Sequence, residues 1–376
     1  MIDKNNIPQG YKNSVVGIIP EEWEVKRLGE VCVTFKSGTT ITSQSIRRMG
    51  LYPVYGGNGL RGYADSYTHD GTYILIGRQG ALCGNINFVS GKTYISEHAI
   101  AVQPDETTSI RYLRYKLDFW NLNRFSESSA QPGLSVEKLV RYRLAIPPLA
   151  EQKKIAEILC TWDDAIEKQS KLIEKLELRK RGLMQRLLTG KTRLPGFTEP
   201  WKKIKLGEIS LIQKGVQLNK NRLQLSGLYP TINGGTTPSG YSDSYNTEAN
   251  SITISEGGNS CGFVNFITTR FWCGGHCYLV SPNDSMNKLF LFQLLKYVEV
   301  EIMNLRVGSG LPNIQIKPLL NFMCTIPVLK EQNAIAAVLT FADKEIEKQR
   351  KKLEVLRQQK RGLMQQLLTG KIRVTI

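Results

Sequence analysis

The sequence contains one segment twice, and this duplication limits the architectures that the chain can adopt. The run RGLMQRLLTGK at residues 181–191 returns as RGLMQQLLTGK at residues 361–371. Extended outward, residues 146–194 align without gaps to residues 326–374, with 28 identities in 49 pairs. A repeat of this length indicates two copies of one structural unit.

The similarity continues upstream of each near-identical segment, but it is weaker. At an offset of 178 residues the matching positions are Trp23 with Trp201, Leu28-Gly29-Glu30 with Leu206-Gly207-Glu208, Cys83-Gly84 with Cys261-Gly262, and His98 with His276. Each unit of about 180 residues therefore joins about 145 variable residues to about 45 shared ones. Two copies that agree at their ends and differ in between indicate a common frame that carries two different recognition modules.

The shared segment predicts a long helix of about 38 residues, or ~57 Å. Pro147 and Pro148 precede the first predicted helix and Gly190 follows it, while Pro327 and Gly370 flank the second, as helix start and stop signals do. Positions 155, 159, 162, 166, 169, 173, 176, 180, 183 and 187, most of them apolar, follow alternating spacings of four and three, and the second copy has the same phase. This is the pattern of a coiled-coil seam. The predicted seam residues are Ile155, Leu159, Ile166, Ile173, Leu176, Leu183, Leu187, Ile335, Leu339, Ile346, Leu353, Leu356, Leu363 and Leu367.

A soluble helix of this length with one apolar stripe needs a partner, and its repeat can supply one. A globular module between the two helices would let them fold back and pair antiparallel. Gln169 and Gln349 occupy the same seam position near the middle. A polar seam residue commonly fixes register, although two glutamines that only tolerate a wet seam explain the pattern equally well.

The variable segments predict α+β modules. Short β-rich runs such as Thr72–Gly77 and Ser251–Ser255 alternate with Gly-rich turns, and amphipathic helices are expected at residues 110–121 and 288–303. The expected fold class is therefore α+β, with two such domains alternating with two long helices paired as an antiparallel coiled coil, in an internal pseudo-two-fold repeat. The predicted boundaries are 1–148 and 191–328 for the globular domains, and 149–190 and 329–376 for the helices.

The charge of the chain points to a polyanionic partner. Fifty Lys and Arg residues against 33 Asp and Glu residues leave a formal net charge of +17, which favours nucleic acid; an inert basic surface is the alternative.

Seven scattered cysteines predict reduced, cytosolic thiols and not a disulfide framework. No apolar run approaches the ~20 residues of a membrane span, and the N-terminus has no apolar signal segment.

Motifs for catalysis or cofactor binding are not apparent. Gly57–Gly62 has dinucleotide-binding spacing, but polar turn sequence follows it where a helix should begin. Gly190–Thr192 resembles the end of a phosphate-binding loop, but it ends a helix. Cys273, His276 and Cys277 could supply three metal ligands; no fourth is indicated, so buried or surface thiols are the favoured interpretation. The tetrapeptide that adenine methyltransferases use, Asn or Asp followed by two prolines and an aromatic residue, is also missing.

Over essentially its whole length, the sequence resembles a known family: the specificity (S) subunits of type I restriction–modification systems, the HsdS proteins. The motifs that carry the resemblance open and close the two shared segments. The openings read IPPLAEQKKIAEIL at residues 146–159 and IPVLKEQNAIAAVL at residues 326–339, and each segment closes with LLTGK. Starts such as Trp23–Glu30 are also typical of the family.

The resemblance implies a non-catalytic, cytoplasmic subunit that binds double-stranded DNA. Each globular domain would read one half of a bipartite, asymmetric target, while the helices set the spacer and dock two methyltransferase (M) subunits. The M subunits would methylate adenine N6 with S-adenosylmethionine, and restriction (R) subunits would cleave unmethylated DNA with ATP and Mg. The family thus implies no cofactor and no metal in this chain.

Candidate DNA-binding residues lie in Gly-rich or turn segments, where the backbone can approach DNA closely. Arg pairs with guanine, and Asn or Gln with adenine. The candidates are Arg47, Arg48, Asn58, Arg61, Arg78, Gln79 and Gln131 in the first domain, and Asn219, Arg222, Asn233, Thr236, Thr237, Asn259, Arg306 and Asn313 in the second. A solvated polar loop is the alternative for each position.

Two other classes of protein stay open on the sequence alone. A stand-alone methyltransferase or nuclease would need a cofactor or catalytic motif. A structural coiled-coil adaptor for a partner other than DNA would make the basic charge incidental, and retention on DNA in the presence of M would exclude it.

Overall fold

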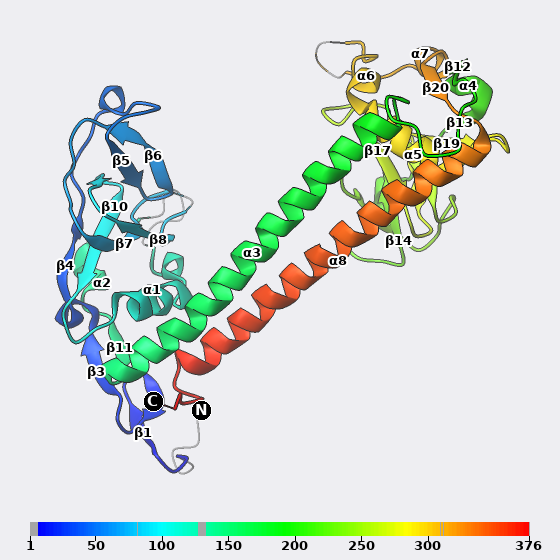
Figure 1. The fold of residues 1–376 in the computed structure, drawn as a ribbon. Helices are drawn as coiled ribbons and strands as arrows, with labels where there is room; N and C mark the ends of the chain where they lie inside the picture. Colours follow the sequence, from blue (N-terminus) through cyan, green and yellow to red (C-terminus); the bar gives the residue numbers. More distant parts are fainter. Residues whose placement is uncertain (1–6, 81, 127–132, 309, 311, 376) are drawn as a thin grey trace. The chain divides into compact units, whose positions relative to one another are not determined.

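The structure, a computed structural model, describes residues 7–80, 82–126, 133–308, 310 and 312–375. The chain forms two compact units. The first comprises Met1–Gln169 with Lys352–Ile376, and the second comprises Ser170–Lys351. Each unit contains one globular domain and a stretch of both long helices (Figure 1).

The globular domain of the first unit is built on two small sheets. The antiparallel sheet has the order β4-β10-β7-β8, with β4 Cys32–Ser37, β10 Ala99–Pro104, β7 Thr72–Gly77 and β8 Ile86–Ser90. The second sheet has the order β6-β5-β9, with β6 Gly59–Ala64, β5 Tyr52–Gly56 and β9 Tyr94–Ile95. Strand β5 pairs antiparallel with β6 and parallel with β9.

Short elements complete this domain and link it to the helices. They are the hairpin β1 Tyr11–Ser14 and β2 Gly17–Pro20, the pair β3 Glu24–Arg27 and β11 Arg143–Ile146, and the helices α1 Ile110–Phe119 and α2 Val136–Leu139. Ser109 caps the start of helix α1, and its side chain accepts a hydrogen bond from the Tyr112 N–H. It packs Tyr112 and Leu113 into the core beside Ile74 and Ile100 of the four-stranded sheet.

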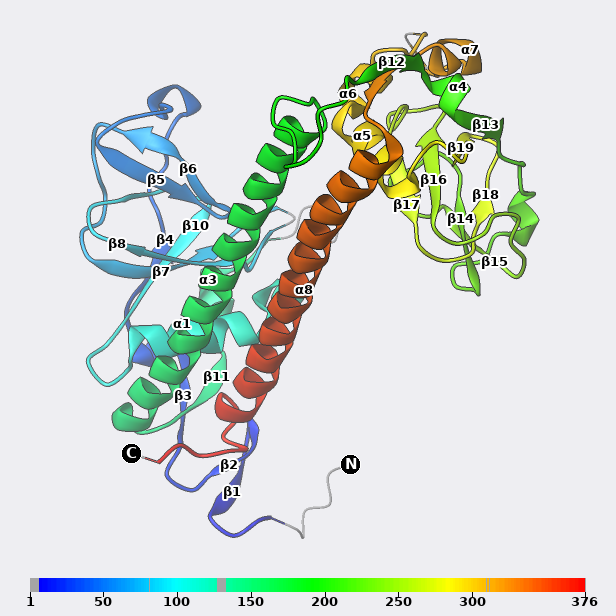
Figure 2. The same ribbon diagram turned by 45° about the vertical axis from the view of Figure 1, so that its right-hand side comes forward.

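The second unit repeats this topology (Figure 2). Its four-stranded sheet has the order β13-β19-β16-β17, with β13 Ser210–Lys214, β19 Cys277–Pro282, β16 Ser251–Ser255 and β17 Val264–Ile267. The order β15-β14-β18 follows with β15 Gly240–Ser242, β14 Tyr229–Ile232 and β18 Trp272–Cys273. The remaining elements are β12 Lys202–Lys205 paired with β20 Met323–Ile326, and the helices α4 Leu206–Ile209, α5 Lys288–Tyr297, α6 Glu299–Met303 and α7 Ile316–Leu320.

The predicted α+β class and internal repeat are confirmed, and the predicted strands Thr72–Gly77 and Ser251–Ser255 are β7 and β16. One helix differs from the prediction, because the helix expected at 288–303 is interrupted at Val298. The Glu299 carboxylate accepts hydrogen bonds from the Val264 N–H and from Lys296 Nζ. These contacts tie the turn to β17, so the chain starts a second short helix there.

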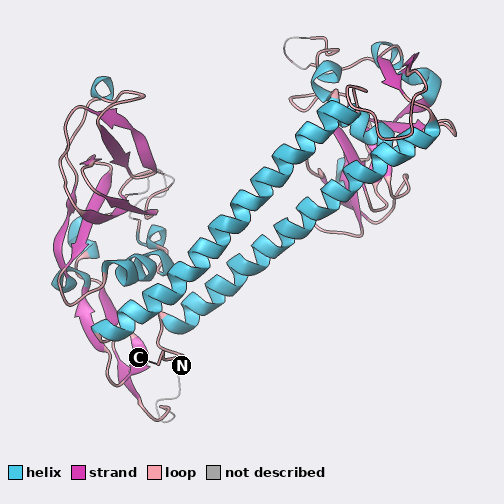
Figure 3. Cartoon of the chain, viewed as in Figure 1, coloured by secondary structure: helices cyan, strands magenta, loops and turns pink. Residues whose placement is uncertain are grey.

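The two shared segments form α3 (Leu149–Leu187) and α8 (Leu329–Leu367), each 39 residues long (Figure 3). None of the predicted seam residues is exposed. Ile155, Leu159, Ile173, Leu187, Ile335, Leu339, Ile346 and Leu367 are buried, and Ile166, Leu176, Leu183, Leu353, Leu356 and Leu363 are half-buried. The ends of both helices also join the domain cores, which the sequence did not indicate: Leu159 and Leu367 lie in the first core, and Leu187 and Leu339 in the second.

Within each unit, a stretch of α3 runs beside a stretch of α8 in the opposite direction. In the first unit, Lys360 Nζ lies 2.5 Å from Asp163 Oδ1. In the second, Lys180 Nζ lies 2.5 Å from Asp343 Oδ1. Asp163 also accepts from the Tyr115 hydroxyl, as Asp343 does from a side-chain amide in α5. An equivalent lysine–aspartate ion pair therefore links α3 to α8 in each unit.

A buried carboxylate in the first turn of each long helix joins the parts of its unit. Glu151 is fully buried; it accepts hydrogen bonds from Trp23 Nε1 at 3.0 Å and from Nε and Nη2 of Arg373 at 2.7 and 2.9 Å. We call Trp23, Glu151 and Arg373 the first clasp. The pKa of the Arg373 guanidinium is raised, chiefly by its hydrogen bond to Glu151.

The second clasp consists of Trp201, Glu331 and Arg193. Glu331 is also fully buried, and it accepts from Trp201 Nε1 at 3.2 Å and from Nε and Nη2 of Arg193 at 2.6 and 2.7 Å. In the first clasp the arginine follows α8 at the end of the chain, whereas in the second it follows α3 inside the chain. The second unit is therefore one continuous segment of the chain, whereas the first unit combines two segments, residues 1–169 and 352–376.

The glutamine after each clasp glutamate explains the Glu-Gln pair of the shared motif. Gln152 Oε1 accepts from the Ser109 N–H, and its Nε2 donates to the Pro147 carbonyl at 2.9 Å. Gln332 makes the same contacts with the Asn287 N–H and the Pro327 carbonyl. Each amide thus satisfies backbone groups that would otherwise be buried without partners.

We expect that Glu151→Gln lowers the free energy of unfolding by about 2–3 kcal/mol, because it removes the charge of a fully buried carboxylate that pairs with Arg373. Thermal and denaturant unfolding of the full chain measure the change. The control is Glu157→Gln on the same helix, whose partner Lys154 is exposed, with an expected change within about 0.5 kcal/mol. Equal effects of the two substitutions would contradict a structural role for the clasp.

Candidate nucleic-acid interface

In each globular domain, an equivalent set of hydrogen bonds to the backbone holds one loop residue. We call this set the loop frame, or the frame for short. In the first domain, the Arg78 N–H donates to the His98 carbonyl at 2.9 Å, and the Arg78 carbonyl accepts from the Leu134 N–H at 2.9 Å. The Cys83 thiol donates to the same carbonyl at 3.4 Å. Three separate segments therefore converge on Arg78.

The second domain repeats this frame around Glu256. Its N–H donates to the His276 carbonyl at 2.8 Å, and its carbonyl accepts from the Ile314 N–H at 2.8 Å. The Cys261 thiol donates to that carbonyl at 3.0 Å. Arg78 and Glu256 thus occupy equivalent positions with opposite charge.

Glycines let a turn of the smaller sheet approach this frame. A Cβ atom on Gly57 would lie 2.8 Å from the His98 carbonyl oxygen, and one on Gly234 would lie 2.8 Å from that of His276. Gly234 also has a φ of +89°, which L side chains rarely adopt. In both domains, glycine is therefore needed where the turn packs against the frame.

Four predicted residues of the first domain lie around this meeting point. Asn58 is exposed in the turn between β5 and β6, and Arg61 follows on β6, where its Cδ packs over Gly56. Gln79 follows Arg78, and its Oε1 lies 3.3 Å from His98 Nδ1. The structure therefore brings Asn58, Arg61, Arg78 and Gln79 to neighbouring segments at one end of the small sheet.

The other predicted residues of the first domain lie apart from this group. Arg47 and Arg48 are exposed on the segment that pairs with Tyr63 of β6. Arg47 Nη2 lies 3.0 Å from Asp65 Oδ2 in an exposed ion pair. Gln131 lies outside the described residues.

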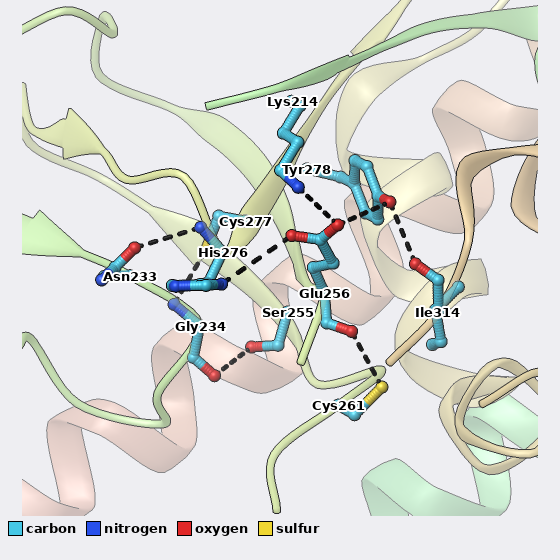
Figure 4. A network of polar contacts seen from close by, with 10 residues as sticks. All are labelled: Lys214, Asn233, Gly234, Ser255, Glu256, Cys261, His276, Cys277, Tyr278 and Ile314. Carbon is cyan, nitrogen blue, oxygen red and sulfur yellow. Dashed lines mark hydrogen bonds and ion pairs between the residues drawn. The ribbon is translucent and has the colours of Figure 1, made fainter. Parts of the chain in front are cut away.

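In the second domain, three predicted residues lie around Glu256. Asn233 and Asn313 line an open hollow of about 500 Å³ together with Lys214, Glu256 and His276, and Asn259 is exposed in the adjoining turn. Asn233 is partly committed to structure, because its Oδ1 accepts the His276 N–H at 3.1 Å (Figure 4).

Five further predicted residues do not line this hollow. Thr236 and Thr237 are exposed between β14 and β15, and Arg306 is exposed after α6. Asn219 and Arg222 are exposed in the segment before β14, where Asn219 Oδ1 accepts the Asn221 N–H at 3.1 Å.

The sequence interpretation did not include Lys214, Glu256 and His276. Lys214 Nζ lies 2.7 Å from Glu256 Oε1, and His276 Nδ1 lies 4.0 Å from Oε2 (Figure 4). The Tyr278 hydroxyl lies 3.2 Å from Oε1 and 2.9 Å from the Ile314 carbonyl, and its pKa is raised to about 12, chiefly by burial. An alignment of the two copies through Cys83 and Cys261 would have placed Glu256 opposite Arg78.

The cysteines near this hollow serve the fold. Cys277 Sγ accepts the Gly234 N–H at 3.1 Å, and a hydrogen bond between the two thiols raises the pKa of Cys273 and lowers that of Cys277.

Across the described ranges, no three His, Cys, Asp or Glu side chains are grouped so that they could hold a metal ion. In the same part of the chain, no helix has the length and apolar character needed to cross a bilayer.

Comparison with known proteins identifies a family model and relatives that match this chain. The family model for the type I restriction modification DNA specificity domain matches the chain twice, over residues 20–178 and 198–357. The specificity subunit of the Escherichia coli type I restriction enzyme EcoprrI is 39% identical over 159 residues, which are 41% of this chain and 39% of that protein. The MjaVIII specificity subunit of Methanocaldococcus jannaschii is 26% identical over 406 residues, which cover 95% of this chain and 94% of that protein.

Solved structures share the fold. The S subunit of the type I restriction–modification system of M. genitalium has a TM-score of 0.69 at 18% identity, with 92% of this chain and 96% of that chain covered. A chain from a study of complex assembly and conformational transition of the type I R-M system has a TM-score of 0.57 at 19% identity, with 94% and 99% covered.

Proposed function

The chain belongs to the family of type I restriction modification DNA specificity domains, and we propose that each of its two globular domains reads one half of a bipartite DNA target. The observation that carries this proposal is the repeated loop frame with different side chains on it. Arg78 and Glu256 differ in charge although the same backbone hydrogen bonds hold both. Two domains that share a frame and differ at such positions are suited to reading two different sequences.

The internal symmetry supports a target with two half-sites. In each unit the stretches of α3 and α8 run antiparallel and are closed by an equivalent lysine–aspartate pair. We propose that the two domains meet DNA in opposite orientations and that the helices set the unread spacer between the half-sites. Because the domains differ, the target is asymmetric. Base-edge contacts would set the sequence, and Lys and Arg contacts with phosphates the register.

We further propose that the long helices dock two methyltransferase (M) subunits. Exposed apolar side chains on their surfaces support this: Phe341 is 73% exposed, Leu178 63% and Val355 50%. In this proposal, the M subunits would cover these side chains. A coiled-coil adaptor with no DNA target would have no need for two different sets of loop side chains on one frame.

Catalysis is assigned to the partner subunits. In this proposal, M holds S-adenosylmethionine and methylates adenine N6, while restriction (R) subunits hold ATP and Mg and cleave unmethylated DNA in the cytoplasm. The sequence supports a non-catalytic role, because it lacks the proline-containing tetrapeptide with which adenine methyltransferases hold the target amine.

The central test is an exchange of one domain. We expect that replacing residues 24–146, from β3 to β11, with the same segment of another specificity subunit changes one half-site and leaves the other intact. Methylation mapping with the M subunits present measures both half-sites. The reciprocal exchange of residues 202–326 should change the other half-site. A chimera that altered both half-sites together would contradict independent domains.

The isolated chain should not bind S-adenosylmethionine, because the methyl donor site is assigned to M. Calorimetric titration of the purified chain is expected to give no saturable heat, and the complex with M should give a signal. A stoichiometric heat from the chain alone would contradict the assignment.

The third test lengthens both helices by one heptad, through duplication of residues 167–173 in α3 and 347–353 in α8. Seven residues keep the seam in phase and add ~10 Å at 1.5 Å per residue. Because DNA rises ~3.4 Å per base pair, we expect a spacer about three base pairs longer with both half-sites unchanged. Duplication in α3 alone should abolish site-specific methylation. An unchanged spacer in the double insertion would mean that the helices do not set the distance.

A further inference from the structure

The two frame positions differ in more than one side chain, and the differences are matched. In the first domain, Ser37 of β4 pairs with Ile100 of β10. In the second, Lys214 of β13 pairs with Tyr278 of β19. Lys214 therefore stands where the first domain has Ser37, and it accompanies Glu256, which stands where the first domain has Arg78. The lysine is present in the domain that has a carboxylate for it to orient.

Glu256 is not needed to build the frame. The first domain forms the same backbone hydrogen bonds with Arg78 at this position, so a carboxylate contributes nothing that the fold requires there. The pair with Lys214 also adds little stability, because the lysine side chain is 54% exposed. A structural role therefore does not explain why an acidic residue stands in a basic chain at this point.

The position of the carboxylate suits it to accept a hydrogen bond from a ligand. Only 15% of the Glu256 side chain is exposed, and its Oε1 is held by Lys214 and faced by Tyr278. Among the residues that the structure describes, none donates a hydrogen bond to Oε2. His276 approaches it to 4.0 Å, and the carboxylate lines the open hollow (Figure 4).

Carboxylate chemistry narrows what such an acceptor can bind on DNA. Phosphate oxygens repel it, so Glu256 cannot serve as a backbone contact. In the major groove, the donors on base edges are the exocyclic amino groups, N4 of cytosine and N6 of adenine. Guanine offers only acceptors there, which suit the guanidinium of Arg78 instead.

We propose that Glu256 determines specificity in the second domain by accepting a hydrogen bond from the exocyclic amino group of one base in its half-site. Lys214 is the positioning residue that fixes the carboxylate, and Arg78 performs the complementary task at the equivalent position, where it contacts guanine. This inference rests on the proposed function, because it requires the second domain to read bases in the major groove.

The test uses the full chain in complex with its M subunits and a panel of duplexes in which each base pair of the second half-site is replaced in turn. The wild-type complex should prefer cytosine or adenine at one position, and the panel tells which. Glu256→Gln should lower that preference about 10- to 100-fold if the base is cytosine, or retain part of it if the base is adenine, which glutamine also binds. Glu256→Arg should move the preference at that position to guanine.

Matched variants separate reading from folding. Glu248→Gln removes a carboxylate of the same domain that is paired with Arg270 at the surface, and it should leave every preference unchanged. Unfolding curves of all variants check that the domain is intact. Uniform weakening on every duplex, or no change at any position after Glu256→Gln, would overturn the inference. A wild-type complex with no preferred duplex would instead overturn the proposed function.

Discussion

The buried glutamate in the first turn of each long helix is the interaction on which the rest of the structure depends. Glu151 and Glu331 are fully buried, and each binds an arginine through two nitrogens. A buried carboxylate is costly unless it is paired and hydrogen-bonded. The buried carboxylate at the start of the helix therefore needs both the arginine and the tryptophan as hydrogen-bond partners. Because the arginine follows one long helix and the glutamate begins the other, each clasp requires both helices.

This arrangement separates what makes the chain fold from what makes it specific. The clasps, the glutamines beside them and the interhelical ion pairs recur in both units with the same geometry. The loop frames recur as well, but the side chains on them differ, as Arg78 and Glu256 do. Substitution at a frame position therefore changes the chemistry that DNA would meet, while the backbone hydrogen bonds that hold the position remain available to any residue except proline.

Much of the architecture could be predicted because it is encoded locally. The heptad pattern predicted α3 and α8, and short β-rich runs predicted β7 and β16. Contacts between distant segments could not be predicted in this way. Arg373 lies beyond the helix that the pattern defines, and nothing local pairs it with Glu151. Glu256 could not be predicted from the preference of base edges for Arg, Asn and Gln, because its importance emerges only from comparison with Arg78 at the equivalent position.

The central claim is that two equivalent units with different loop residues read two half-sites. Genome-wide mapping of adenine methylation, in cells that express this chain with its M subunits and in cells that lack it, tests the claim most directly. We predict one added motif, made of two different half-sites separated by a spacer of fixed length and unrestricted sequence. A palindromic motif, a single uninterrupted motif or no added methylation would contradict it.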